Sequence, residues 1–141
     1  MNIKTEPTKL KDITRAWHLV DVNNEVLGRA CTKIALLLMG KAKPYFAKNM
    51  DCGDYVVVVN ARNVKVSGQK ENKKLYRRHS GYPGGYKETP LLKLRHTKPT
   101  EIVRFAVLGM LPDNKLKARL MTRLHIFPDA KHDYETKFKA G

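Results

Sequence analysis

The clearest pattern of apolar and polar positions lies between residues 27 and 39. Apolar side chains recur there in steps of three and four residues, the spacing of one face of an α-helix: Leu27, Ala30, Cys31, Ile34, Leu37 and Leu38. Gly40 follows as the expected C-terminal cap, because glycine readily adopts the left-handed conformation that ends many helices. The pattern therefore predicts a helix over Leu27 to Met39.

Three other apolar runs predict strands. Tyr55 to Val59 is a continuous run rich in β-branched residues, which is typical of a fully buried central strand, more often in a parallel sheet. Trp17 to Asp21 alternates poorly and predicts a strand buried on both faces, followed by a turn at Asn23 and Asn24. Leu124 to Phe127 predicts a final strand.

The second half of the chain carries three helical patterns. The strongest covers Thr100 to Leu111, with Thr100 as the expected N-cap and Pro112 at its end. Thr89 to Thr97 predicts a short helix with Pro90 in its first turn. Asn114 to Met121 predicts a third helix.

The middle of the chain is basic and poorer in apolar residues. Leu75 to Ser80 predicts a basic strand, and the glycines and proline of residues 81–86 predict a loop. Val64 to Val66 predicts an edge strand or the turn of a small hairpin. Strands separated by helices around a buried valine run favour an α/β domain with a mostly parallel sheet.

The length of 141 residues fits one domain. We expect residues 1–14 to form an extended basic arm, 15–128 a single α/β domain and 129–141 a polar tail. The N-terminus has no apolar leader, and the longest apolar runs are too short to cross a bilayer. Two widely spaced cysteines, Cys31 and Cys52, fit a reducing compartment. These features predict a cytoplasmic protein.

The net charge gives the strongest indication of a binding partner. The sequence has 28 Lys and Arg against 13 Asp and Glu, a formal net charge of +15. A small globule with that excess repels itself, and a polyanion relieves the repulsion. Nucleic acid is the first candidate, and an anionic membrane surface is the second. Membrane binding is disfavoured because no basic helix has the bulky aromatic-rich apolar face that it needs.

Basic residues gather in two segments. The first interleaves them with glycine and tyrosine, which suits contact with phosphates and stacking on unpaired bases. The second follows the helix that ends near Pro112. The candidate RNA-binding residues are Lys70, Lys73, Lys74, Arg77, Arg78, His79, Ser80, Gly81, Tyr82, Gly84 and Gly85 in the first segment, and Lys115, Lys117, Arg119 and Arg123 in the second.

Signals for catalysis are poor. No phosphate-binding loop or nucleophile elbow is present, and the histidines lack metal-ligand spacing. Only Asp51 and Asp54 could form an acid–base or metal pair, and carboxylates beside a glycine more often bond turn amides. We expect no catalytic site, cofactor, metal or small-molecule substrate. A small RNA-processing enzyme and a DNA-compacting protein remain as alternatives.

Five blocks of sequence, in order and in register, resemble the L13 family of bacterial-type large-subunit ribosomal proteins. The likeness covers about Ile13 to Phe127, in the blocks Trp17 to Asp21, Leu27 to Ala30, Asp51 to Ala61, His79 to Gly85 and Gly109 to Pro112. The resemblance implies a three-layer α/β/α fold around a mainly parallel sheet. It also implies direct binding of large-subunit rRNA early in subunit assembly, with other large-subunit ribosomal proteins as neighbours.

In that family the basic stretch around the glycine-rich loop and the region after the Gly-Met-Leu-Pro block face RNA. The resemblance thus implies RNA contact for the first candidate segment and for Lys115, Lys117 and Arg119. One departure stands out. Family members usually have Gly-Arg where this chain has Lys117 and Ala118, with Arg119 one place later.

Overall fold

Three parallel strands form the central sheet of the computed structural model, which describes residues 6–139. They are β1 (Trp17–Asp21), β2 (Tyr55–Val59) and β5 (Leu124–Ile126), in the order β1-β2-β5. Val57 at the centre of β2 is paired in register with Leu19 of β1 and His125 of β5. The valine run is thus the central strand of a parallel sheet, and the predicted α/β class is confirmed.

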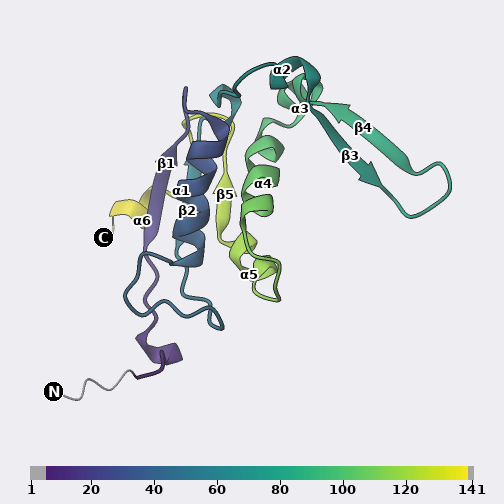
Figure 1. Ribbon diagram of the computed structural model, residues 1–141. Coiled ribbons are helices and arrows are strands. Elements are labelled where there is room, and N and C mark those ends of the chain that lie inside the picture. Colours follow the sequence, from purple (N-terminus) through teal and green to yellow (C-terminus); the bar gives the residue numbers. More distant parts are fainter. Residues whose placement is uncertain (1–5, 140–141) are drawn as a thin grey trace.

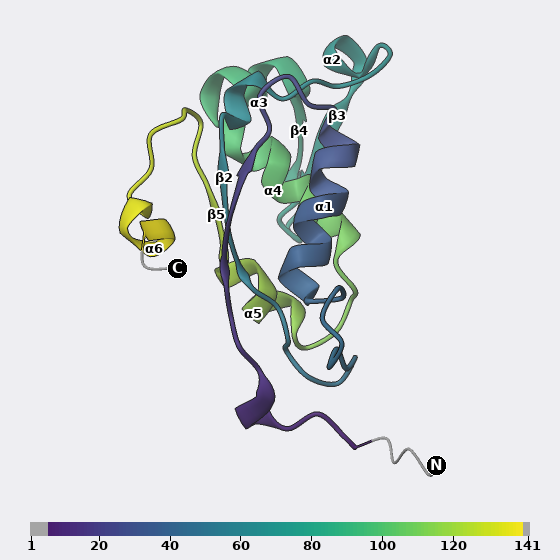
Figure 2. The same cartoon turned by 90° about the vertical axis from the view of Figure 1, so that its left-hand side faces the viewer.

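Helices α1 (Leu27–Met39) and α4 (Pro99–Met110) cover one face of this sheet (Figure 2). Both crossovers, β1 to β2 and β2 to β5, step in the same direction, so right-handed connections bring their helices to the same side. Val56 and Val58 of β2 pack there against buried side chains of both helices. The predicted bounds of α1 are confirmed, and Gly40 caps it with φ 73°.

The opposite face carries a thinner layer. Short helix α6 (Glu135–Lys139) lies on that side of the sheet (Figure 2). Trp17 stacks on Tyr55 at 4.3 Å between ring centroids and on Tyr134 at 5.3 Å. The prediction that Trp17–Asp21 is buried on both faces is wrong, because β1 is an edge strand and Leu19 is 51% exposed.

A two-stranded antiparallel hairpin projects from the body (Figure 1). It consists of β3 (Leu75–His79) and β4 (Tyr86–Pro90), and it is flanked by α2 (Lys70–Lys73) and α3 (Leu91–Thr97). Strand β4 was not predicted from the sequence, and the helix expected from Thr89 begins at Leu91 instead. The segment is polar, and what makes it a strand is its pairing with β3.

Two further helix predictions need correction. Helix α4 starts at Pro99, whose fixed φ suits a first turn, so Thr100 lies inside the helix and is not its cap. Helix α5 (Lys117–Thr122) begins later than predicted, because Asn114 holds a turn by accepting the backbone N–H of Leu116 at 3.0 Å.

Outside the main elements, the remaining predictions change in detail. The arm holds a 3₁₀ turn, η1 (Leu10–Asp12), and Thr8 donates to the carbonyl of Tyr45 at 2.6 Å; residues 1–5 lie outside the described part. The segment Val64 to Val66 makes one isolated bridge, between Lys65 and Val26, and follows a 3₁₀ turn, η2 (Ala61–Asn63). In residues 6–139 no helix combines the length and apolar character needed to cross a membrane.

Candidate nucleic-acid interface

The β3–β4 hairpin carries the first candidate segment. Strand side chains alternate between faces, so Arg77 and Arg78 point to opposite sides of the ribbon. Arg77 lies across from Glu88 and forms an ion pair with it at 3.5 Å. Arg78 lies across from Lys87, and like charges placed opposite each other destabilise a strand pair. The face of Arg78 therefore gains most from a bound anion.

The loop at the hairpin tip, residues 80–85, has a defined backbone. Gly81 and Gly84 have φ values of 86° and 72°, which favour glycine. The N–H of Gly85 donates to the carbonyl of Tyr82 at 2.9 Å, and a Cβ at Gly85 would lie 1.9 Å from Ser80 Oγ. Tyr82 is 75% exposed. The loop thus presents an aromatic ring on a constrained turn.

His79 is also fixed by this loop. Its Nδ1 accepts the backbone N–H of Gly81 at 2.9 Å. In the neutral ring the proton must then sit on Nε2, so the outer nitrogen is a donor. His79 can therefore offer a hydrogen bond to a phosphate or base beside the loop.

Arg95 links the base of the hairpin to the rest of the domain. Its Nε and Nη2 donate to the two carboxylate oxygens of Glu71 at 2.7 and 2.9 Å. Its Nη1 donates to the carbonyls of Arg62 and Val64 at 3.0 and 2.8 Å. The backbone N–H of Leu91 donates to the carbonyl of Lys74 at 3.0 Å. The exposed lysines at the base of the hairpin, Lys70, Lys73 and Lys74, thus lie on a segment that is hydrogen-bonded to the rest of the domain.

The second candidate segment divides into surface and interior residues. Lys115 and Arg119 are exposed, and Lys117 is partly exposed and pairs with Asp113 at 2.6 Å. Arg123 is only 7% exposed. The structure therefore does not place Arg123 on the surface with the other three, although helical spacing put it on the face of Arg119.

Arg123 is held inside the molecule by Asp51. Its Nη1 donates to Asp51 Oδ2 at 2.5 Å, and its Nη2 donates to Asp51 Oδ1. Burial alone would raise the pKa of Asp51, but the hydrogen bonds and charge of Arg123, with the charge of Arg15, keep that pKa below its ordinary value. Asp51 is thus the ionised half of a buried pair that joins the chain before β2 to the chain before β5.

Asp54 has its own cation. Its Oδ1 accepts Lys43 Nζ at 2.5 Å and the backbone N–H of Ala16 at 3.0 Å, and its Oδ2 lies 2.8 Å from His18 Nε2. Burial opposes ionisation of Asp54, yet these partners hold its pKa below the ordinary value. Both carboxylates that the sequence offered for acid–base or metal chemistry are therefore occupied in structural ion pairs.

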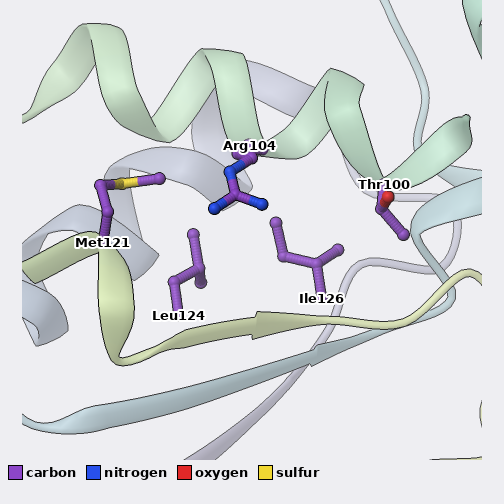
Figure 3. A pocket seen from close by; sticks show the side chains of 5 residues that line it. All are labelled: Thr100, Arg104, Met121, Leu124 and Ile126. Atoms are coloured by element: carbon purple, nitrogen blue, oxygen red, sulfur yellow. The ribbon is translucent and has the colours of Figure 1, made fainter. Parts of the chain in front are cut away.

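The two candidate segments lie at opposite ends of α4 (Figure 1). A 12-residue helix is about 18 Å long, so an extended polyanion is needed to touch both. Sequence reasoning missed three exposed cations near this helix: Lys93, Lys98 and Arg104. Arg104 reaches from α4 toward β5, between Met121 and Thr100 and over Leu124 and Ile126 (Figure 3). Arg104 occupies a polar position of the predicted helix over residues 100–111, and Lys93 and Lys98 lie between the two candidate segments, so their charge was the signal available in the sequence.

The sequence matches a family of known proteins over most of its length. The family model described as "Ribosomal protein L13" matches residues 15–133. The chain belongs to the ribosomal protein L13 family. The resemblance found in the sequence is thus confirmed. L13 is a family of structural ribosomal proteins and not of enzymes, which confirms the prediction of a non-catalytic protein.

Relatives match almost the whole chain. A "Large ribosomal subunit protein uL13" of Dehalococcoides mccartyi (strain ATCC BAA-2100 / JCM 16839 / KCTC 5957 / BAV1) is 43% identical over 96% of this chain and 94% of its own length. Proteins of the same name from Solibacter usitatus (strain Ellin6076) and Clostridioides difficile (strain 630) are 48% and 47% identical, over 91% and 94% of this chain. They cover 89% and 92% of their own lengths. The likeness therefore includes both the sheet and the hairpin.

Proposed function

We propose that this chain is a structural constituent of the large ribosomal subunit that binds large-subunit rRNA directly and helps early subunit assembly. Its place is in the cytoplasm, within the subunit, beside neighbouring large-subunit ribosomal proteins. Membership of the L13 family and the names of the relatives support this role. A net charge of +15 suits a partner that supplies phosphates.

The observation that carries the binding proposal is the projecting hairpin. It places opposed like charges, Arg78 and Lys87, and a highly exposed Tyr82 on a rigidly anchored ribbon. Such a ribbon can enter RNA without loss of the domain's own core. The residues proposed to contact RNA are Lys70, Lys73, Lys74, Arg77, Arg78, His79, Ser80, Gly81, Tyr82, Gly84, Gly85, Lys115, Lys117 and Arg119.

Arg123 is left out of this set because its guanidinium is buried against Asp51. In the proposed domain organisation, residues 15–128 form the single α/β domain that positions the hairpin. Residues 1–14 and 129–141 are the arm and the tail on either side of it. The electrostatic mechanism selects the rRNA arrangement in which phosphates meet both ends of α4, and it stabilises that arrangement over others.

Charge reversal on the hairpin tests the proposal. The variant Arg77→Glu/Arg78→Glu should bind a full-length large-subunit rRNA transcript at least tenfold more weakly than wild type in filter binding, because each lost phosphate contact also loses counterion release. Its circular dichroism spectrum should be unchanged, since both side chains are exposed.

The matched control is Arg29→Glu/Lys33→Glu, which makes the same change in net charge on the exposed side of α1. It should bind rRNA much more tightly than the hairpin variant does. Equal losses in the two variants would mean that net charge alone drives binding. An unchanged affinity of the hairpin variant would remove the hairpin from the interface. Duplex DNA as competitor separates rRNA binding from general DNA compaction.

A further inference from the structure

A groove separates the hairpin from helices α3 and α4. Its volume is about 540 Å³. That size lies within the range of roughly 300–1,000 Å³ typical of sites that enclose a small organic ligand. It is lined by Tyr76 and Arg78 of β3, Lys93 of α3, Lys98 between the helices, and Glu101 and Phe105 of α4. The groove therefore lies between the β3–β4 hairpin on one side and helices α3 and α4 on the other.

The charge of the groove is mainly positive and mainly uncompensated. Arg78, Lys93 and Lys98 form no ion pair with any of residues 6–139. Arg77 borders the groove as well, but it points to the other face of the ribbon, where it is paired with Glu88. Glu101 is the one acidic side chain among the lining residues. Three unpaired cations around one hollow favour an anionic ligand.

The groove also has an aromatic wall. Phe105 is 43% exposed, and its ring centroid lies 5.6 Å from that of the partly buried Tyr76. Tyr76 packs against the hydrophobic core, and Lys74 Nζ lies 5.2 Å from its ring centroid. An exposed phenyl ring beside unpaired cations suits a ligand that has both a flat apolar surface and a negative charge.

We propose that this groove binds an unpaired nucleotide of the rRNA, with its base against Phe105 and its flanking phosphates at Arg78, Lys93 and Lys98. The inference rests on the proposed function and adds a specific site to it. A nucleotide supplies both the flat surface and the charge, because aromatic side chains stack on unpaired bases while lysine and arginine bind the backbone. A peptide that offered only acidic side chains would pair with the cations but would leave Phe105 exposed.

Two variants separate the base contact from the phosphate contacts. Phe105→Leu keeps an apolar side chain but removes the ring, and it should weaken binding of a full-length large-subunit rRNA transcript about tenfold, the usual size of one base–aromatic stack. Lys93→Glu/Lys98→Glu should lower the slope of log affinity against log salt by about 2, one for each phosphate contact. Arg29→Glu/Lys33→Glu serves as the control for net charge.

Cross-linking identifies what occupies the groove. Large subunits reconstituted with rRNA containing 4-thiouridine are irradiated, and the cross-linked peptides are identified by mass spectrometry. Cross-links to the peptides that contain Tyr76 or Phe105 support the proposal. Cross-links confined to residues 80–85, or a protein cross-linked to the groove in place of RNA, overturn it.

The outcomes also separate this inference from the proposed function. If the wild-type chain fails to bind rRNA, both are wrong. If the wild type binds and Arg77→Glu/Arg78→Glu binds weakly, but both groove variants bind like wild type, only the groove is wrong. If Phe105→Leu fails to fold, the salt dependence of the lysine variant still decides, because Lys93 and Lys98 are exposed and outside the core.

Discussion

Replacing Arg123 by methionine tests whether this residue supports the fold or contacts RNA. The substitution keeps most of the side-chain volume and removes the guanidinium. It leaves Asp51, whose side chain is 12% exposed, without the bidentate partner that reaches it from residue 123. Arg15 remains near the carboxylate, but its Nη1 lies 3.5 Å from Asp51 Oδ1.

The expected loss is about 3 kcal/mol in the free energy of unfolding at pH 7. Removing one partner of a buried ion pair costs roughly 3–5 kcal/mol, because the other charge stays buried and unpaired. The lower end applies here, since Arg15 compensates part of the charge and Asp51 retains some contact with water. Arg119→Met, on the exposed side of α5, should change stability by less than about 0.5 kcal/mol.

The pH dependence gives a second signature. The pKa of Asp51 is lower in the folded chain than its ordinary value, so its contribution to stability is complete above that ordinary value and is lost as pH falls through the lowered pKa. Wild type should therefore lose stability in acid below about pH 4. Arg123→Met should lose less stability over the same pH range, because without Arg123 the pKa of Asp51 is no longer lowered as far.

Urea unfolding, followed by fluorescence of Trp17 and by circular dichroism, measures both effects, and filter binding measures rRNA affinity on the same samples. We expect Arg123→Met to have a lower midpoint in urea, with little change in the rRNA affinity of the folded protein. A variant as stable as wild type that binds rRNA tenfold more weakly would show that Arg123 contacts RNA and does not support the fold. Arg123 would then have to reach RNA, and Asp51 would have to be neutral or solvated.

Two further substitutions probe the hairpin. Arg95→Met should lower the free energy of unfolding by about 2 kcal/mol, because the charged hydrogen bonds to Glu71 are lost. Amide hydrogen exchange should accelerate most in β3 and β4. Equal acceleration throughout the domain would show that Arg95 does not act locally on the hairpin. Gly85→Ala should weaken rRNA binding by about 1 kcal/mol with little change in stability, since a Cβ there meets Ser80 Oγ at 1.9 Å in an exposed loop. Gly28→Ala, whose methyl meets nothing within 4 Å, is its control, and equal binding by both variants would show that the loop shape is unimportant.

The elements that the sequence predicted best are those whose pattern is complete within a few turns. Helix α1 has its apolar stripe and its glycine cap in one stretch of 14 residues, so local periodicity fixed both ends. The valine run of β2 is apolar on both faces, and only a central strand buries both. Net charge and the interleaved glycines of residues 80–85 likewise required no tertiary information to indicate a polyanion and a basic loop.

Tertiary structure decided what depends on partners far along the chain. Strand β4 exists because β3 lies beside it, and β1 is an edge strand because both crossovers run the same way. Arg119 and Arg123 have the same charge and lie one helical turn apart, yet only Arg123 meets a carboxylate 72 residues away. Periodicity is a local property of the backbone, whereas burial and ion pairing depend on which distant segment the fold brings near. The groove at Phe105 likewise depends on how the β3–β4 hairpin folds back against α3 and α4, which the sequence pattern did not show.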